Sequence, residues 1–598
     1  MTNIIESNLE EKAREIRKSL ITALYHADSG HPGSSLSWTD IAASLFFNEI
    51  NLEKGDRFML SKGHAVPTLY AILCMKGYAD EKRFEKELRK IGSPFQGHPV
   101  AGTLPHIYAS TGSLGQGLSF ALGMAEAKKL SKQNERVYVL LGDGELQEGQ
   151  NWEAFRYGCN RKMDNLIAII DKNGYQNDAA VDETMPLGNL ERQLESFGWN
   201  VIKVDGHNFN ELRQAYANAK KILGKPTAII AETVKGKGVR HIESNRKKHN
   251  GAMTGEEYVN AMLDLGVKIK EPPIKFQAKN SINNEPASGI RDAFGEALAE
   301  AGKEYGRLVV VDCDLGSATK TLKFKEKFPE RFFQVGIAEQ HGVSLAAGLA
   351  KEGYRPFISS FGAFLTQRAK DQIMNSVAYS NAGVVLVGSH SGLAIGKDGA
   401  TQMGIDDINA MMAIPNMEIY SPASAVEIKQ VVNYLVNGNQ FAYLRTSRRP
   451  VPNIHDNNYS FNPERVDVIK DCGRENGISI MATGDMVYYA LQAAKELEKE
   501  IPLDVINFCR LKPIDRESVI SYARRRAGII TLEDHSIIGG LGSRVCEIIA
   551  EEGLGKRVLR QGLRDCFGES GEPEDLYKKH KLDIEGIKNS MREFYLET

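Results

Sequence analysis

Residues 137–149 read Val-Tyr-Val-Leu-Leu-Gly-Asp-Gly-Glu-Leu-Gln-Glu-Gly, an apolar run that ends in glycines and acids. Five apolar residues before such a turn are typical of a buried strand in a parallel sheet that is covered on both faces. Ligands of α/β proteins bind at the carboxyl ends of such strands. The stretch therefore predicts a parallel α/β sheet that brings Asp143 to a ligand-binding edge.

The same alternation of apolar runs and helical patterns extends over the chain. Predicted strands are Val137–Leu141, Leu166–Ile170, Ala228–Ala231, Val309–Val311, Val384–Val387, Ile478–Met481, Val505–Phe508 and Ile529–Leu532. Residues 8–27 predict a helix with Asn8 as its N-cap. Residues 268–284 and 448–463 are rich in Pro and Asn and lack periodicity, which indicates linkers. We expect three α/β domains with mostly parallel sheets at residues 1–275, 286–450 and 465–598.

Composition excludes several classes of protein. Of the 598 residues, 42% are hydrophobic and 25% charged, and the net charge of -2 comes without a long basic block, so no nucleic-acid partner is expected. No run approaches the roughly 18 apolar residues of a membrane span, and the first residues do not resemble a signal peptide. Seven scattered cysteines without a CxxC pair indicate free thiols and a cytoplasmic location.

The polar residues that follow two predicted strands point to a metal. Asp143 follows the first strand, and Asn173 follows a second strand over residues 165–171. Carboxylate and amide oxygens suit a hard cation such as magnesium or calcium, which could bridge to a diphosphate. A lone Gly-Asp-Gly is usually only a turn, but the two strands with their polar ends favour the metal site.

This arrangement resembles the thiamine-diphosphate fingerprint, and Gly142–Gly149 followed by Trp152-Glu-Ala154 resembles the transketolase family specifically. Further motifs in family order are Ser29–Gly33, Asp56–Ala65, Gly97–Pro99, Thr111–Gly117, Ile337–Gln340 and Gly396–Gly399. Gly112–Leu114 and Arg445–Arg448 are most similar to the shorter, animal-like branch. The resemblance implies two thiamine-diphosphate-binding-fold domains, one for the diphosphate and metal and one for the pyrimidine, followed by a C-terminal transketolase-type α/β domain.

The resemblance also implies the cofactor site. Asp143, Asn173 and the carbonyl of Tyr175 would bind Mg²⁺, or Ca²⁺ or Mn²⁺. Thiamine diphosphate would contact His64, Gly112, Ser113, Leu114, Gly142, Asp143, Gly144, Glu145, Asn173, Lys235, His249, Asp314, Glu339, Phe361, Phe364 and Gln367. Glu339 would lie against pyrimidine N1′, where burial keeps a carboxylic acid protonated and able to activate the cofactor.

Histidines and cations complete the predicted site. A lone histidine is usually structural, but several in Gly- or Pro-flanked loops suit a polyhydroxylated substrate, because imidazole exchanges protons near neutral pH. By resemblance the catalytic residues are Glu339, His31, His64, His98, His249 and His390, and the substrate-binding residues are His31, Arg291, Ser317, His390, Asp398, Gln402 and Arg448. The two arginines suit the phosphate of a sugar phosphate.

The implied reaction moves a two-carbon ketol group from a ketose phosphate to an aldose phosphate through a dihydroxyethyl-thiamine-diphosphate intermediate. The family places each cofactor between two subunits, so a homodimer is implied, with Glu148 and Glu153 coupling the paired sites. The segments 482–485 and 533–540 look like loops after strands without a catalytic constellation, so the C-terminal domain is interpreted as supporting the dimer.

Four positions depart from the family pattern. Ala318 stands where a phosphate-binding serine is usual, Lys397 where Glu is usual, Gln402 where some branches have His, and Asn250 interrupts His249 and Gly251. They leave room for a specialised transketolase that acts on an uncommon sugar. Two other hypotheses are a deoxyxylulose-phosphate synthase-like enzyme, which would lack the Leu-Gln-Glu-Gly continuation, and a catalytically silent cofactor-binding scaffold.

Overall fold

A computed structural model describes residues 2–245, 251–275, 287–456, 458–474 and 476–598. The described chain divides into two compact units. The first comprises the residues up to 275 together with 336–338 and 397–401, and the second comprises the remaining residues. Within the described residues, no helix combines the length and the apolar character that crossing a membrane requires.

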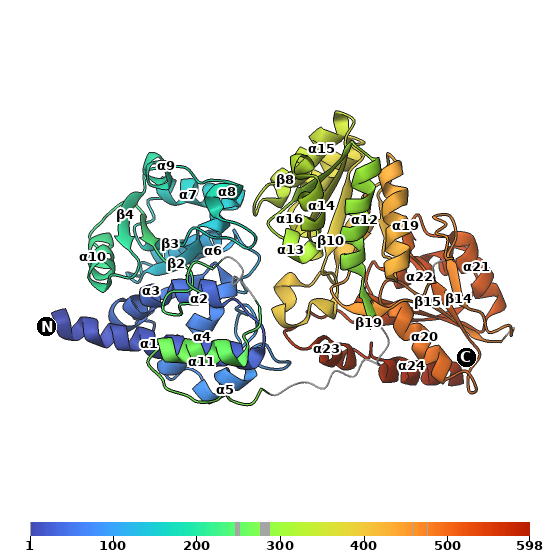
Figure 1. The fold of residues 1–598 in the computed structure, drawn as a ribbon, viewed down its shortest axis with the longest axis horizontal. Helices are drawn as coiled ribbons and strands as arrows, with labels where there is room; N and C mark the ends of the chain where they lie inside the picture. The colour runs from blue at the N-terminus through green and yellow to red at the C-terminus, as the bar shows by residue number, and fades with distance from the viewer. Residues whose placement is uncertain (1, 246–250, 276–286, 457, 475) are drawn as a thin grey trace. The chain divides into compact units, whose positions relative to one another are not determined.

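The first unit is built on a five-stranded parallel sheet in the order β1-β2-β3-β5-β4 (Figure 1). The strands are β1 (Arg57–Leu60), β2 (Val137–Gly142), β3 (Leu166–Lys172), β4 (Asn200–Asp205) and β5 (Thr227–Glu232). The helices are α1 (Thr2–Ala27), α2 (Pro32–Ser37), α3 (Thr39–Ser44), α4 (Val66–Met75), α5 (Glu81–Glu87), α6 (Gly117–Leu130), α7 (Gly149–Asn160), α8 (Val181–Thr184), α9 (Leu190–Ser196), α10 (Phe209–Ala219) and α11 (Gly255–Asp264).

The apolar runs form strands because both faces of this sheet are buried. Tyr138 and Leu140 of β2 point into one hydrophobic cluster, which includes residues of α1, α3 and α4. Val139 and Leu141 point into a second cluster, which includes residues of α6 and α7. Since successive side chains of a strand face opposite sides, a strand covered on both faces must be apolar throughout.

Helix α1 is longer than the sequence predicted. It begins at Thr2, so Asn8 lies inside the helix and its prediction as the N-cap is wrong. No glycine or proline precedes Asn8 in residues 2–7, so nothing in that stretch stops the helix from extending.

The second unit contains two large sheets. The second sheet has the order β17-β11-β12-β10-β9-β7-β8, and the C-terminal sheet has the order β14-β16-β15-β18-β19. Both are parallel except for the antiparallel edge strands β17 and β14. A short antiparallel pair, β6 (Ala287–Gly289) with β13 (Pro450–Pro452), joins the two ends of the segment that contains most of the second sheet.

The strands of the second sheet are β7 (Leu308–Asp312), β8 (Phe332–Gln334), β9 (Arg355–Phe361), β10 (Val385–Ser389), β11 (Glu418–Tyr420), β12 (Ala442–Arg445) and β17 (Arg510–Lys512). Those of the C-terminal sheet are β14 (Asp467–Lys470), β15 (Ile478–Ala482), β16 (Leu503–Asn507), β18 (Gly528–Ser536) and β19 (Arg557–Leu563). The helices are α12 (Ile290–Glu304), α13 (Gly316–Thr319), α14 (Leu322–Lys327), α15 (Glu339–Lys351), α16 (Gly362–Arg368), α17 (Lys370–Gln372), α18 (Asp407–Met412), α19 (Ala425–Asn437), α20 (Met486–Glu496), α21 (Arg516–Arg525), α22 (Leu541–Glu551), α23 (Pro573–Lys579) and α24 (Ile584–Leu596).

The two large sheets of the second unit share one core. Buried Val311 and Ile419 of the second sheet belong to the same hydrophobic cluster as Met481 and Ile529 of the C-terminal sheet. Strand β17 lies between β16 and α21 in the sequence, yet it pairs with β11 of the second sheet. The C-terminal segment therefore completes the edge of the sheet that precedes it.

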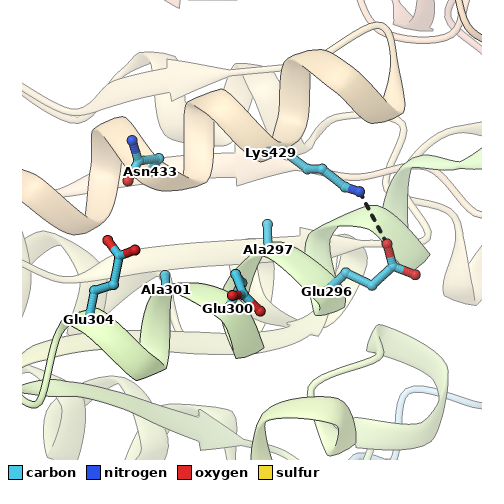
Figure 2. Close-up of a pocket in the computed structure, with 7 residues that line it drawn as sticks. All are labelled: Glu296, Ala297, Glu300, Ala301, Glu304, Lys429 and Asn433. Carbon is cyan, nitrogen blue, oxygen red and sulfur yellow. Dashed lines mark ion pairs between the residues drawn. The ribbon is translucent and has the colours of Figure 1, made fainter. Parts of the chain in front are cut away.

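Helices α12 and α19 pack side by side on the second unit, with a hollow of about 330 Å³ between them (Figure 2). Glu296, Glu300 and Glu304 follow one another along α12, and Lys429 of α19 pairs with Glu296 at 3.3 Å. This acidic hollow contains no residue of the predicted site.

Two loops, one of which follows the carboxyl end of β1, approach each other so closely that only glycine fits between them. A Cβ built on Gly63 would lie 2.7 Å from the backbone nitrogen of Gly112 and 2.7 Å from the carbonyl carbon of Thr111. Gly112 itself has φ +134°, which L side chains rarely adopt. The spacing of the loops before α4 and α6 therefore depends on Gly63.

We expect Gly63→Ala to force these loops apart, because the clash is with backbone that cannot rotate away. The free energy of unfolding should fall by about 1–3 kcal/mol, the usual cost of an overpacked site. Thermal unfolding of the variant measures the change. Gly306→Ala is the matched control, since a Cβ there meets nothing within 4 Å; equal stability of the two variants would contradict the close approach.

Candidate functional site

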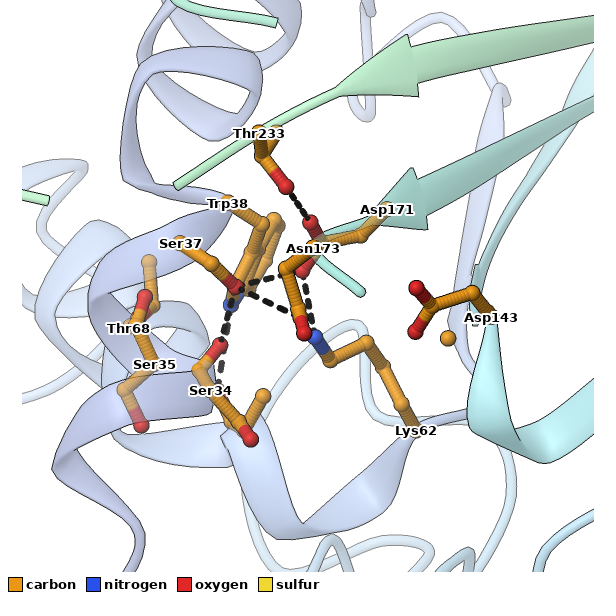
Figure 3. Close-up of polar contacts among 12 residues, drawn as sticks. Ser34, Ser35, Ser37, Trp38, Lys62, Thr68, Asp143, Asp171, Asn173 and Thr233 are labelled. Carbon is orange, nitrogen blue, oxygen red and sulfur yellow. Dashed lines mark hydrogen bonds and ion pairs between the residues drawn. The ribbon is translucent and has the colours of Figure 1, made fainter. Parts of the chain in front are cut away.

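The ends of β2 and β3 bring the predicted metal ligands together. The strands are neighbours with Gly142 opposite Asp171, so the loops that carry Asp143 and Asn173 leave the same edge. The Asp143 carboxylate accepts hydrogen bonds from Gly144 N at 2.9 Å and Gly174 N at 2.6 Å. Asn173 Oδ1 accepts one from Tyr175 N at 3.1 Å. Figure 3 shows the Asp143 carboxylate turned toward the group around Asn173.

The electrostatics of this edge fit a cation. Burial raises the pKa of Asp143 to about 6, and the nearby charge of Asp171 adds to the rise. Two buried carboxyl groups this close disfavour each other's charge, and a divalent ion would offset that cost. The donor set of carboxylate, amide and backbone oxygens is also the kind that Mg²⁺ and Ca²⁺ prefer.

Asp171 is held from three directions (Figure 3). Its Oδ2 accepts hydrogen bonds from Ser37 Oγ and Lys62 Nζ, each at 2.5 Å, and its Oδ1 accepts one from Thr233 Oγ1. Asp171 and Lys62 are almost completely buried. Asn173, two residues further on, donates to the same Ser37 hydroxyl at 3.5 Å. The network thus fixes the segment that carries Asn173.

Glu145, predicted to contact the cofactor, uses both carboxylate oxygens within the protein. Oε1 accepts from Ser61 Oγ at 2.5 Å and Gly115 N at 3.0 Å, and Oε2 accepts from Gly142 N at 3.1 Å. Burial raises the pKa of this carboxyl group. Glu145 therefore joins the end of β2 to the loop over residues 112–116.

Lys235 places a buried positive charge near the predicted metal ligands. Its Nζ donates to Gln176 O at 3.1 Å and lies 5.6 Å from the centre of the Tyr175 ring. The side chain is 1% exposed. A buried ammonium beside an oxygen-rich edge is suited to an anionic group such as a diphosphate.

Three predicted histidines of the first unit cluster. The ring of His31 lies 5.3 Å from that of His64 and 6.1 Å from that of His98. Arg89 Nη2 lies 3.3 Å from His31 Nδ1, and its Nη1 donates to Ser29 Oγ at 3.1 Å. Burial, with the charge of Arg89, lowers the pKa of His31 to about 3 and that of His98 to about 4. Both rings are neutral near pH 7 and can accept or share a proton.

In the second unit, Glu339 is the first residue of α15 and is 1% exposed. Ser360 Oγ donates to Glu339 Oε1 at 3.1 Å, and Arg368 Nη1 donates to Oε2 at 2.9 Å. Sequence reasoning predicted a buried acid at this position but not its partner Arg368. The carboxyl group is thus held in place by groups from β9 and α16.

Aromatic rings connect Glu339 to a histidine. Arg368 lies 5.4 Å from the Phe364 ring, which stacks on Phe361 at 5.7 Å. Phe361 in turn stacks on His390 at 4.3 Å. A flat ring could be held against such a surface by stacking, which adds on the order of 1 kcal/mol to burial.

Arg291 extends the row of contacts beyond His390. Arg291 Nη1 lies 3.1 Å from His390 Nε2 and donates to Ala318 O at 3.1 Å. Burial lowers the pKa of Arg291, and the charge of Arg448 lowers it further. Neighbouring like charges of this kind favour a bound anion.

Three family models together match most of the chain. Residues 9–305 match the family model of the transketolase thiamine diphosphate binding domain, residues 287–453 that of the transketolase pyrimidine binding domain, and residues 468–587 that of the transketolase C-terminal domain. The chain belongs to the transketolase family. The predicted three-domain α/β fold with mostly parallel sheets is therefore confirmed.

Individual transketolases align over almost the whole chain. Human transketolase is 35% identical, over 98% of this chain and 97% of its own length. Mouse transketolase-like protein 2 is also 35% identical, over 97% and 95%. These animal proteins fit the resemblance to the animal-like branch. A transketolase crystal structure from Campylobacter jejuni is 25% identical over 99% of both chains, with a TM-score of 0.46.

The remaining predicted residues lie as follows. Gly112, Ser113 and Leu114 form the loop before α6, Asp314 follows β7 with φ +61°, and Ser317 lies in α13. Asp398 ends the 3₁₀ turn Leu393–Asp398, and buried Gln402 ends another at Ala400–Gln402. Gln367 is exposed and its amide donates to Asp406 at 2.7 Å. His249 and Asn250 lie outside the described residues.

Sequence reasoning missed the partners that hold these side chains. Lys62 and Ser37 orient the metal edge, Arg89 contacts His31, and Arg368 holds Glu339. Ser37, Lys62 and Arg89 each lie far in sequence from the residues they contact, although Lys62 is part of the motif Asp56–Ala65. For Arg368 a signal existed, since it lies four residues after Phe364, one helical turn away.

The depressed pKa of His98 predicts a pH-dependent stability. Between pH 6.5 and about 4 the unfolded chain binds a proton at this residue and the folded chain does not. Its contribution to stability is therefore lost as pH falls, with a slope of ~1.4 kcal/mol per pH unit. We expect His98→Asn to make the free energy of unfolding less dependent on pH in this window.

Urea titrations between pH 4.5 and 7 measure this effect. His341→Asn, at an exposed position of α15, is the control and should keep the wild-type slope. Identical slopes for His98→Asn and wild type would contradict the buried neutral imidazole.

Proposed function

We propose that this protein is an active transketolase, which transfers a two-carbon ketol unit from a ketose phosphate to an aldose phosphate. The observation that carries the proposal is the continuous line of contacts in the second unit from Glu339 through Phe364, Phe361 and His390 to Arg291. It joins a buried acid and aromatic surface, suited to a pyrimidine, to a cationic end suited to a sugar phosphate.

Thiamine diphosphate and a divalent metal fit the groups that the chain offers. Asp143, Asn173 and the carbonyl of Tyr175 would hold Mg²⁺, or Ca²⁺ or Mn²⁺, and Lys235 would neutralise the diphosphate. The raised pKa of Asp143 and the buried ammonium of Lys235 both fit a group of opposite charge. When bound, thiamine diphosphate supplies a nucleophilic carbon that can accept and pass on a ketol unit.

The protein side chains would then do three kinds of work. Glu339 would hold a proton at the pyrimidine nitrogen, with Ser360 and Arg368 fixing its carboxyl group. His31, His64 and His98 would bind substrate hydroxyls and exchange protons with them as neutral imidazoles, a role shared with His249 and His390. Arg291 and Arg448 would bind the phosphate end of the substrate. This would hold the reacting carbon of the substrate in position relative to the cofactor.

We also propose a cytoplasmic homodimer with active sites that two subunits share. Large aromatic side chains remain exposed on each unit, namely Phe120 and Tyr157 on α6 and α7, and Tyr379 after α17. Aromatic residues are enriched at the interfaces between protein chains. The seven cysteines form no disulfide, which fits a reducing compartment. Sedimentation of the purified protein as a monomer would contradict the dimer.

The proposed function is tested by kinetics with purified protein, thiamine diphosphate and Mg²⁺. The proposal is supported if a ketose phosphate and an aldose phosphate together yield a new ketose phosphate with two carbons more than the aldose acceptor. Carbon dioxide release from pyruvate would favour the synthase-like alternative instead. Ala318 and Lys397 motivate a panel of uncommon sugars, and tight cofactor binding without turnover of any ketose would indicate a silent scaffold.

Glu339→Gln should keep the hydrogen bond from Ser360 but remove the ionisable carboxyl group, together with its ion pair to Arg368. We expect kcat to fall by about 10²–10⁴-fold, the usual range for a lost acid–base group. Calorimetry should show the fold intact. Glu352→Gln, at an exposed position just after α15, is the control. Wild-type turnover by Glu339→Gln would exclude the assigned role.

Arg448→Leu should weaken phosphate recognition selectively. A hydrogen bond to a charged group is worth about 1.5–3 kcal/mol, which predicts a KM roughly 10–100-fold higher for phosphorylated donors. An unphosphorylated ketose serves as the internal control and should keep its KM. Equal effects on both substrates would show that Arg448 supports the fold and not the phosphate.

A further inference from the structure

The C-terminal sheet has a topological switch point of its own. The chain passes from β15 to β16 on one side and returns to β18 on the other, so its strand order reverses between β15 and β18. Open α/β sheets bind ligands at such a switch point, outside the carboxyl ends of the strands. Two segments without an assigned role end there, 483–485 after β15 and 533–535 in β18.

This switch point is filled by the protein itself. Arg445, from β12 of the second sheet, donates from Nη2 to Asp534 O at 2.8 Å and from Nε to Asp407 at 2.9 Å. Ser447 Oγ donates to Asp485 Oδ2. The hollow left among Arg445, Ser447, Asp485 and Asp534 is about 10 Å³, no more than the space of one water. At the carboxyl end of this sheet, protein side chains therefore occupy the place where other open α/β sheets bind a ligand.

Asp534 makes the most specific of these contacts. Leu393 N donates to Oδ1 at 2.9 Å and to Oδ2 at 3.1 Å, and Tyr577 OH donates to Oδ2 at 3.0 Å. A Cβ on Gly392, where φ is +80°, would overlap Asp534 Oδ2. The C-terminal sheet thus binds the backbone of the turn that follows β10.

Further hydrogen bonds hold a second segment, residues 402–405, against the same sheet. Ser536 N donates to Ile405 O at 2.8 Å, Arg445 Nη2 donates to Gly404 O at 3.3 Å, and Gly392 N donates to Gly404 O at 2.9 Å. Residues 390–396 and 402–405 are therefore tied both to each other and to β18.

His390 lies at the start of this captured segment, three residues before Leu393. Its φ of +57° is uncommon for a residue other than glycine and costs of order 1–2 kcal/mol, so the surroundings must hold it. Its side chain stacks on Phe361 and contacts Arg291. The position of a proposed substrate histidine thus depends on backbone that Asp534 binds.

We propose that the carboxyl end of the C-terminal sheet is a socket for residues 390–396 and 402–405, with Asp534 as a positioning residue for His390. The part that concerns substrate rests on the proposed transketolase function. The socket itself does not depend on that function, because it consists of contacts within the second unit.

Hydrogen exchange of the purified full chain, read by mass spectrometry, tests the socket without any substrate. Asp534→Ala leaves Leu393 N without its acceptor, so peptides covering 389–396 should exchange roughly tenfold faster. Asp534→Asn keeps an acceptor oxygen and should restore slow exchange. With active enzyme, Asp534→Ala should lower kcat/KM by about 100-fold, the cost of a misplaced site group.

Asp504→Asn is the matched control for general damage to the domain. Asp504 is a buried acid of the same sheet, near the start of β16, where it is paired with Arg526 at 2.6 Å. Its variant should loosen the sheet without a selective change in 389–396. Unchanged exchange in Asp534→Ala, or a pattern equal to that of Asp504→Asn, would overturn the socket. An inactive wild type would refute the proposed function alone.

Discussion

The buried carboxylate of Asp171 is the interaction on which the first unit depends. It ends β3 beneath the candidate metal edge, and Lys62, Ser37 and Thr233 come from three other segments to satisfy it. A buried charge of this kind is tolerated only with its partners in place, and loss of one partner costs several kcal/mol. These contacts therefore fix the end of β3, which leads directly to Asn173 and pairs with the end of β2 just before Asp143.

Much of this architecture can be predicted from the sequence, since the central strands carry their own signal. Val137–Leu141 of β2 and Leu166–Ile170 of β3 are continuous apolar runs because both faces of these strands are buried. The strands that were missed are short, exposed at one edge or of mixed polarity. β8 has three residues, and β4 contains Asn200 and Lys203. β17 pairs with a sheet from the preceding domain, which no local pattern encodes.

The residues of the candidate site also fall into two groups, those that the sequence could identify and those that it could not. Residues inside motifs, such as Asp143, Asn173 and Glu339, could be named because turn chemistry and family order mark them. Several side chains that hold them could not be named, because their pairings join residues far apart in sequence. Lys62 reaches Asp171 across 109 positions, and Asp534 reaches Leu393 across 141. Long-range electrostatic complementarity is a property of the folded chain and leaves no local pattern.

The crossing of β17 into the second sheet also bears on how this chain could be divided. A fragment that ended near residue 465 would present β11 as a bare edge, with unpaired N–H and C=O groups that recruit other strands and promote aggregation. The complementary fragment would leave Arg510–Lys512 without its partner strand. The pyrimidine and C-terminal segments are separate modules in sequence but a single piece for expression, fusion or recombination.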